Sequence, residues 1–185
     1  MTPLHPQLRS VIEQFETATT RVRGYGGLPE ARVLARPADG QWSAAECVQH
    51  LTVTTHAFLP RLDEALIRLE SRPVDPSRRY RRDVIGWLLA WALEPPVRTR
   101  TKTPGSFAPP PTLTLAGTVT EFLTAQTALV ERIARGDGRA LDRLRIVSPF
   151  DARVRYTVWS AFLVMAAHQR RHLWQADRAL AVVTA

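Results

Sequence analysis

The chain contains very little cysteine and very little lysine, and each of these features limits the classes of protein to which it can belong. Cys47 is the single cysteine of 185 residues, which excludes an intrachain disulfide framework. It lies within a helical pattern with no cation beside it in sequence, so we expect a buried and unreactive thiol. Lys102 is the single lysine, and the formal net charge of +8 therefore comes almost entirely from arginine.

The arginines are scattered along the chain and are not interleaved with aromatic residues. A nucleic-acid-binding surface would gather basic residues on one stripe and place aromatic rings among them. We therefore expect no nucleic acid partner. The preference for arginine over lysine, together with abundant alanine, is typical of coding in a GC-rich bacterium.

Long apolar runs and the signatures of several enzyme classes are also missing. The most apolar run covers residues 84–93, far fewer than the ~20 residues that span a bilayer, and the N-terminus lacks the pattern of a signal peptide. The chain has no glycine-rich phosphate loop and no Gly-x-Ser-x-Gly elbow, and Gln169 stands where a zinc protease needs glutamate. We expect a cytoplasmic protein without membrane contact that is neither a common peptidase nor a nucleotide-binding enzyme.

Apolar residues recur at helical spacing through most of the chain. The pattern predicts long helices over residues 6–21, 44–71, 117–135 and 156–182, and shorter helical segments over residues 29–35 and 80–93. A glycine-rich breaker ends the first helix, and Pro60 predicts a kink within the second. No segment sustains an alternation of apolar and polar residues, so a sheet is not expected.

These elements predict an all-α fold, a four-helix bundle with a short extra helix and a long proline-rich connection before the third long helix. The connection is expected to cross from one end of the bundle to the other. The length fits one domain over residues 1–185, because neither a repeat nor a flexible linker divides the sequence.

Two histidines in the last predicted helix form the most informative motif. His168 and His172 are four residues apart, which advances a helix by about 400° and about 6 Å, so both imidazoles leave the same face. That spacing lets two nitrogens reach one ion at about 2.0–2.1 Å. Met165 shares this face, which places His168 on the core side of the helix, where buried polar groups need partners.

His50, on the inward face of the second predicted helix, supplies the expected third ligand. The alternative is a core histidine hydrogen-bonded to a carbonyl. Three neutral nitrogens favour a transition metal over calcium or magnesium, with zinc or nickel as the first choices. His5 lies in the terminal segment, and His56 should face elsewhere because six residues turn a helix by about 600°. Neither is an expected ligand.

Four other residues are weaker candidates for the site. Glu46 could act as a base or support a ligand, but it also completes a capping box with Ser43, and we favour the cap. Arg171 could orient an anionic group at a cavity mouth. Trp42 and Trp174 could line an apolar wall, although ordinary packing is the favoured role for each.

Two segments carry a family resemblance. Residues 42–51 read WSAAECVQHL and residues 168–175 read HQRRHLWQ, and both are similar to motifs of the DinB-like superfamily of four-helix metalloproteins, which includes bacillithiol-transferase-like proteins. Residues 102–109 also resemble a loop of one branch. The resemblance implies three metal ligands at His50, His168 and His172, with histidine where some relatives carry a carboxylate. It implies neither polymerase activity nor direct DNA repair.

The leading functional hypothesis is a metal-dependent transferase that joins a low-molecular-weight thiol to an electrophilic small molecule, as in detoxification or a stress response. Three protein ligands would leave a position for the thiol sulfur. One alternative is a hydrolase that uses a metal-bound water, and another is a non-catalytic, metal-stabilised binding module. The sequence identifies no catalytic residue, and it leaves the oligomeric state open, a homodimer included.

Overall fold

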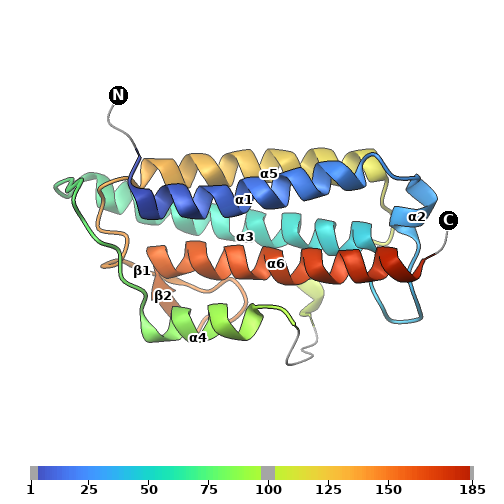
Figure 1. The fold of residues 1–185 in the computed structure, drawn as a ribbon. Helices are drawn as coiled ribbons and strands as arrows, with labels where there is room; N and C mark the ends of the chain where they lie inside the picture. Colours follow the sequence, from blue (N-terminus) through green and yellow to red (C-terminus); the bar gives the residue numbers. More distant parts are fainter. Residues whose placement is uncertain (1–3, 97–102, 184–185) are drawn as a thin grey trace.

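The computed structural model describes residues 4–96 and 103–183, and four long helices form its body (Figure 1). These helices are α1 (Pro6–Tyr25), α3 (Ala44–Glu70), α5 (Leu115–Arg135) and α6 (Val158–Val182). The shorter elements are α2 (Glu30–Leu34), α4 (Val84–Leu93), the 3-10 helix η1 (Gly105–Phe107), β1 (Arg145–Val147) and β2 (Arg155–Thr157). The predicted all-α bundle is confirmed for the described residues.

The long helices enclose two apolar clusters, one toward each end of the bundle. α3 packs against α5 and α6, and α1 packs against the same two helices. One cluster contains Phe15, Leu62 and Phe162, and the other contains Val22 and Leu51. Burial of such side chains is the main force that holds the bundle together, at roughly 1.5–3 kcal/mol for each large apolar residue.

A polar layer separates the two clusters. On α6 the first cluster ends at Ala166 and the second begins at Leu173. Between them Gln169 and Gln126 of α5 form a reciprocal pair, with amide nitrogen to oxygen distances of 2.6 and 3.1 Å. The Gln126 amide also donates to the Phe15 carbonyl at 3.0 Å, which ties α1 into the same layer. Because these amides satisfy one another, the layer can remain buried.

The end of α1 and the start of α5 differ from the sequence-based expectation. α1 continues four residues past residue 21 and ends at Tyr25, because the buried Tyr25 ring packs in the core and its hydroxyl donates to Asp177 of α6. α5 begins at Leu115, two residues before the expected start, since Thr114 caps it by accepting from the Gly117 amide at 3.2 Å.

The prediction that the chain forms no sheet was wrong for six residues. Arg145–Val147 and Arg155–Thr157 pair as antiparallel strands, and α6 therefore begins at residue 158, with Thr157 as its cap. Strands of three residues are too short to show a period-two pattern. Pro60 lies within α3, which continues on both sides of it, and the kink there stays a prediction. The expected crossing by the proline-rich connection includes residues 97–102, outside the described residues.

α4 packs on the outside of the bundle, against α6 (Figure 1). It begins at residue 84, not 80, because Asp83 is the cap. The Asp83 carboxylate accepts from the Gly86 amide at 3.0 Å and from the amide and hydroxyl of Thr157 at 2.8 and 2.9 Å. The fully buried residues of α4 are the small Gly86 and Ala90, and Leu89 and Leu93 are partly buried against the bundle. The other five large side chains of α4 are exposed.

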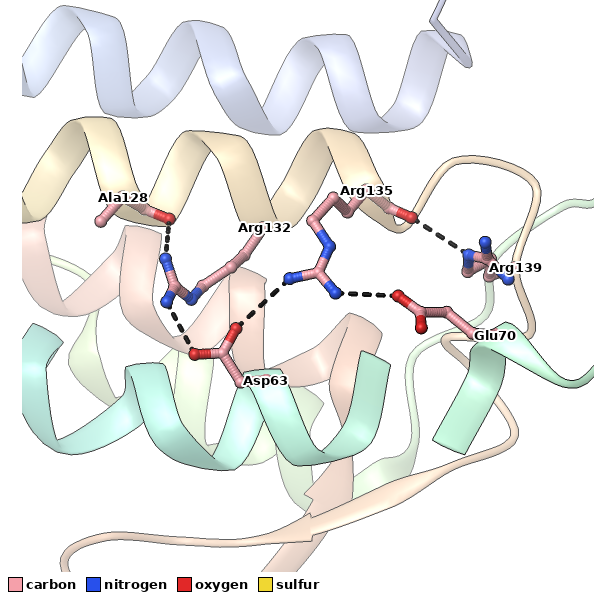
Figure 2. A network of polar contacts seen from close by, with 6 residues as sticks. All are labelled: Asp63, Glu70, Ala128, Arg132, Arg135 and Arg139. Carbon is pink, nitrogen blue, oxygen red and sulfur yellow. Dashed lines mark hydrogen bonds and ion pairs between the residues drawn. The ribbon is translucent and has the colours of Figure 1, made fainter. Parts of the chain in front are cut away.

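A chain of ion pairs joins the outer faces of α3 and α5 (Figure 2). Asp63 of α3 accepts from Arg132 at 2.7 Å and pairs with Arg135 at 3.5 Å. Arg135 also donates to Glu70 at 2.8 Å, and Arg139 donates to the Arg135 carbonyl at 3.2 Å. These groups are partly exposed, so each pair adds only about 0–1 kcal/mol, and the network mainly fixes the register of the two helices.

Replacing Gly86 with valine tests the close approach of α4 and α6. A Cβ at Gly86 would lie 2.2 Å from the Ser160 Cβ, which forces the helices apart. We expect Gly86→Val to lower the free energy of unfolding by about 1–3 kcal/mol in urea titrations. Gly24→Ala in α1 is the matched control, because its added methyl meets nothing within 4 Å, and it should stabilise by up to about 1 kcal/mol. Equal stability of Gly86→Val and the parent would contradict this packing.

Candidate metal centre

Three imidazoles from two helices meet in the polar layer of the bundle. α3 contributes His50 and α6 contributes His168 and His172. One nitrogen of each ring can be chosen so that all three lie within 4.8 Å of one another. The structure therefore brings together the three residues that the sequence selected as ligands.

The position of His50 follows from the start of α3. Ser43 caps the helix by accepting from the Glu46 amide at 3.1 Å, and the Glu46 carboxylate accepts from the Ser43 amide at 2.8 Å, so the predicted capping box is formed. The cap fixes the first turn of α3, and His50 follows Glu46 by one helical turn.

The spacing of the nitrogens suits a single ion. The Nε2 atoms of His50 and His168 are 3.3 Å apart. Two nitrogens that each lie about 2.0–2.1 Å from a tetrahedrally coordinated zinc would be separated by roughly 3.3–3.4 Å. The His172 ring lies 4.5 Å from each of the other two, centroid to centroid. The arrangement fits a divalent metal bound by three neutral nitrogens.

Within the described part of the chain, hydrogen bonding orients the His50 ring and leaves one nitrogen of His172 unpaired. The His50 Nδ1 lies 2.8 Å from the Phe107 carbonyl oxygen. Because a carbonyl only accepts, Nδ1 carries the proton and the Nε2 lone pair is directed toward the other histidines. The Nδ1 of His172 is buried and has no hydrogen-bond partner among the described residues. An orphaned nitrogen in a buried histidine cluster is a further feature that a metal ligand would explain.

All three imidazoles are held in the neutral form. Burial lowers the pKa of His50. Burial, followed by the charges of His50 and Arg171, lowers the pKa of His168 to about 3. The pKa of His172 is well below its usual value, chiefly through burial and then through the charge of His168. Neutral imidazole is the form that binds a metal, so no proton has to be displaced at neutral pH.

Glu46 is already engaged in two interactions. Besides the cap, its carboxylate accepts from the Arg36 Nε at 2.9 and 3.1 Å. Burial raises the pKa of Glu46, but the hydrogen bonds from Arg36 and Ser43 outweigh it and leave the pKa below its usual value. A carboxylate held in this way is a poor proton acceptor. We therefore retain the structural role for Glu46 and do not assign it as a base.

Arg171 lies beside the histidines and is buried. Its Nη1 donates to the Ala92 carbonyl at 3.4 Å, at the end of α4. Burial lowers the pKa of its guanidinium, and its charge lowers the pKa of both His168 and His172. Arg171 therefore places positive charge next to the cluster, although it is not one of the converging ligand groups.

Aromatic rings surround the histidines. The Trp42 centroid lies 5.0 Å from the His50 ring and 5.9 Å from the His172 ring. Phe150 lies 5.8 Å from His168 and 4.7 Å from Phe107. Phe150 is exposed and His168 is only partly buried, so the cluster approaches solvent on this side.

Sequence reasoning did not single out Phe107 and Phe150 as site residues. Phe107 acts through its backbone carbonyl, which any residue could supply, and Phe150 follows β1 in an irregular loop. The only available signal was the family-like loop over residues 102–109.

The remaining candidates lie elsewhere. Trp174 packs against the Arg178 guanidinium, 5.1 Å from its carbon to the ring centroid. His5 caps α1 by accepting from the Gln7 amide, and His56 is exposed on α3. Cys47 is fully buried and burial raises the pKa of its thiol, which agrees with the unreactive cysteine expected from the sequence.

Comparison with known proteins adds one finding. A family model described as the DinB superfamily matches residues 14–176, which include all of α3 and α5, most of α1 and α6, and the three clustered histidines. Searches of curated proteins and of solved structures returned no match. No helix in the described part of the chain has both the length and the apolar character needed to cross a membrane.

Metal content measured for single histidine variants tests the cluster. We expect the parent chain to retain close to one zinc or nickel ion after loading and desalting. His50→Ala, His168→Ala and His172→Ala should each lose most of it, because two imidazoles hold an ion far less tightly than three. His56→Ala is the matched control, since this exposed histidine lies on the same helix as His50. Circular dichroism checks that each variant is folded, and a folded His50→Ala protein with full metal content would exclude His50 as a ligand.

Acid should destabilise the metal-free protein. The folded-state pKa of His168 lies below 6.5, the usual value. Below pH 6.5 the unfolded chain therefore binds a proton at this histidine, whereas the folded chain leaves it unprotonated. The histidines therefore leave stability intact above pH 6.5 and reduce it as the pH falls below that value. The loss is up to about 1.4 kcal/mol per pH unit for each such histidine. Urea unfolding of chelator-treated protein at pH 7.5 to 4.5 measures it. His168→Gln should show a shallower slope than the parent, whereas equal slopes would contradict the depressed pKa.

Proposed function

The chain belongs to the DinB superfamily, and from that membership and its histidine cluster we propose a metal-dependent transferase that joins a low-molecular-weight thiol to an electrophilic small molecule. His50, His168 and His172 would hold the metal, with zinc or nickel as the proposed ion. The observation that carries the proposal is the convergence of three neutral imidazoles on the side of the bundle where Phe150 and His168 approach solvent.

Three protein ligands suit chemistry better than a purely structural role. Structural zinc sites are closed by four protein ligands, whereas catalytic sites have three and leave one position for a reactant. Among the described residues, no cysteine, carboxylate or further histidine joins the three histidines of the cluster. A metal bound there would supply Lewis acidity that lowers the pKa of a thiol and keeps the sulfur as thiolate.

The chain's own residues would bind and orient the reactants. The Phe107 carbonyl fixes the His50 ring and so directs its Nε2. Arg171 places a positive charge beside the cluster, which favours a thiol that carries a carboxylate or another anionic group. Phe107, Phe150 and Trp42 present aromatic surface, which would pack against an apolar electrophile and exclude water from the sulfur.

The proposed reaction forms one sulfur–carbon bond. The thiol releases its proton to solvent, and the thiolate attacks the electrophilic carbon. In a substitution the leaving group departs with its electron pair, and in an addition the adjacent atom takes a proton from solvent. The protein needs no general base for this step, because the lowered thiol pKa already provides the nucleophile.

Hydrolysis has less support from the same residues. Activation of water usually draws on a carboxylate that can move a proton, and Glu46 is held by Arg36 and by the cap. A non-catalytic binding module would use the same triad for stability alone. Both alternatives are outcomes of the test below.

Turnover assays distinguish the three functions. We expect metal-loaded protein to consume an electrophile only when a thiol is present, with bacillithiol, mycothiol and glutathione as the candidates. Product formation is followed by mass spectrometry across several electrophiles. Hydrolysis without thiol would favour the alternative enzyme. No turnover with any thiol, despite full metal content, would overturn catalysis and leave the binding module.

The Phe150→Ala variant tests the aromatic wall. Removing this ring should raise the KM for an aromatic electrophile by roughly tenfold, which corresponds to about 1.4 kcal/mol, and leave metal content unchanged. Ile67→Ala is the control, because Ile67 is a large exposed apolar residue on the same helix as His50 but 17 residues further along it. Unchanged kinetics in Phe150→Ala would remove Phe150 from the proposed substrate wall.

A further inference from the structure

The outward side of α4 exposes an unusual amount of apolar surface. The exposed fractions are 80% for Val84, 41% for Ile85, 50% for Trp87, 52% for Leu88 and 49% for Trp91. We call these five residues the α4 outer face. Among the described residues they are five of the nine exposed large hydrophobic residues, and they lie within one helix of ten residues.

The direction of this face is fixed by the contacts beneath it. Gly86 packs so closely on Ser160 that no larger residue fits, and Ala90 packs beside Val164. Asp83 holds the first turn of α4 to the start of α6. At the other end, Glu94 accepts from the Arg170 Nε at 3.0 Å. α4 is thus held at both ends with its small residues inward, and it cannot rotate to bury the tryptophans.

The exposed area is large enough to drive association. Large side chains offer about 150–250 Å² each, so five residues exposed to about half leave roughly 400–500 Å² of apolar surface. Contiguous apolar patches of this size on soluble proteins commonly mark interaction sites. A standard interface buries about 800 Å² on each partner, so the α4 outer face would supply around half of one side.

The charges around α4 are complementary to a second, antiparallel copy of the same helix. Residues 84–93 carry no charge. The exposed Arg79, Arg81 and Arg82 precede the N-terminus of α4, and Glu94 follows its C-terminus. A helix N-terminus repels cations and a C-terminus repels anions. In an antiparallel pair, however, each arginine cluster lies beside the partner's C-terminus and Glu94.

We propose that the α4 outer face is a homodimer interface in which α4 packs against α4 of a second copy across a two-fold axis near Leu88. Such an isologous contact uses one patch on both partners, and it closes without leaving a surface for further growth. The proposal is independent of the proposed catalytic function, since it uses none of the residues assigned to the metal or to the substrates.

Sedimentation velocity over a range of concentrations tests the assembly. We expect the parent chain to form a dimer, and the double variant Trp87→Glu/Leu88→Glu to weaken its dissociation constant by at least about tenfold, because it buries charge at the centre of the interface. Ile67→Glu is the control, since Ile67 is equally exposed but lies on α3, and it should dimerise as the parent does. A monomeric parent, or a double variant that dimerises normally, would overturn the proposal.

Disulfide trapping tests the antiparallel geometry. Cys47 is buried, so a single introduced cysteine is the only accessible thiol among the described residues. Leu88→Cys lies near the proposed axis and should form a linked dimer under mild oxidation. Val84→Cys should not, because two copies of residue 84 would be roughly 12 Å apart along the helices at 1.5 Å per residue. Faster linkage through Val84→Cys than through Leu88→Cys would exclude this pairing.

A lipid surface is the rival occupant of the same face. Exposed tryptophans beside arginines also suit an anionic membrane interface. Flotation with vesicles of phosphatidylcholine and phosphatidylglycerol distinguishes the two. A parent chain that stays monomeric in solution and binds these vesicles through Trp87 and Leu88 would overturn the dimer in favour of membrane docking. A dimer that does not float would support it.

Discussion

Three imidazoles can be buried in a helical bundle only if their nitrogens find partners, and much of the structure serves this requirement. On α6 the two apolar clusters leave a gap at the histidines, between Ala166 and Leu173, whereas on α3 His50 lies between Val48 and Leu51 of the second cluster. The gap is filled by groups that satisfy one another, with the Phe107 carbonyl on one side and the Gln126–Gln169 pair on the other. One nitrogen of each ring lies within 4.8 Å of the chosen nitrogens of the other two, and this convergence is what makes a metal the natural partner.

The same constraint explains why the site could be read from the sequence. The spacing of His168 and His172 directly gives their shared face, and the capping box at Ser43 sets the phase of α3 from its first turn. Both signals are local and depend on helix geometry alone. That His50 meets the pair is a tertiary fact. Its place on the inward face of the second predicted helix made it the expected third ligand, and the resemblance to a known family implied the same three residues.

Other parts could not be predicted because the deciding contacts are distant in sequence. Phe107 is 57 residues from His50 in sequence and contacts it through a backbone carbonyl. The pattern of side chains in the sequence cannot predict such a contact. α4 was expected to start at Tyr80, but Asp83 caps it through contacts with Thr157, far along the chain. Apolar periodicity also gave no indication that α4 would bury its smallest residues and expose its largest.

One helical turn of α6 contacts four other helices. Among residues 168–172, the two histidines face α3, Gln169 binds Gln126 of α5, and Arg170 reaches both Glu94 and Gln14 of α1. Arg171 donates to the end of α4. Each of these five residues makes a contact with another helix. We therefore expect them to vary less among relatives than the residues of any solvent-facing turn. A relative that altered the three residues between the histidines would need compensating changes in three separate helices.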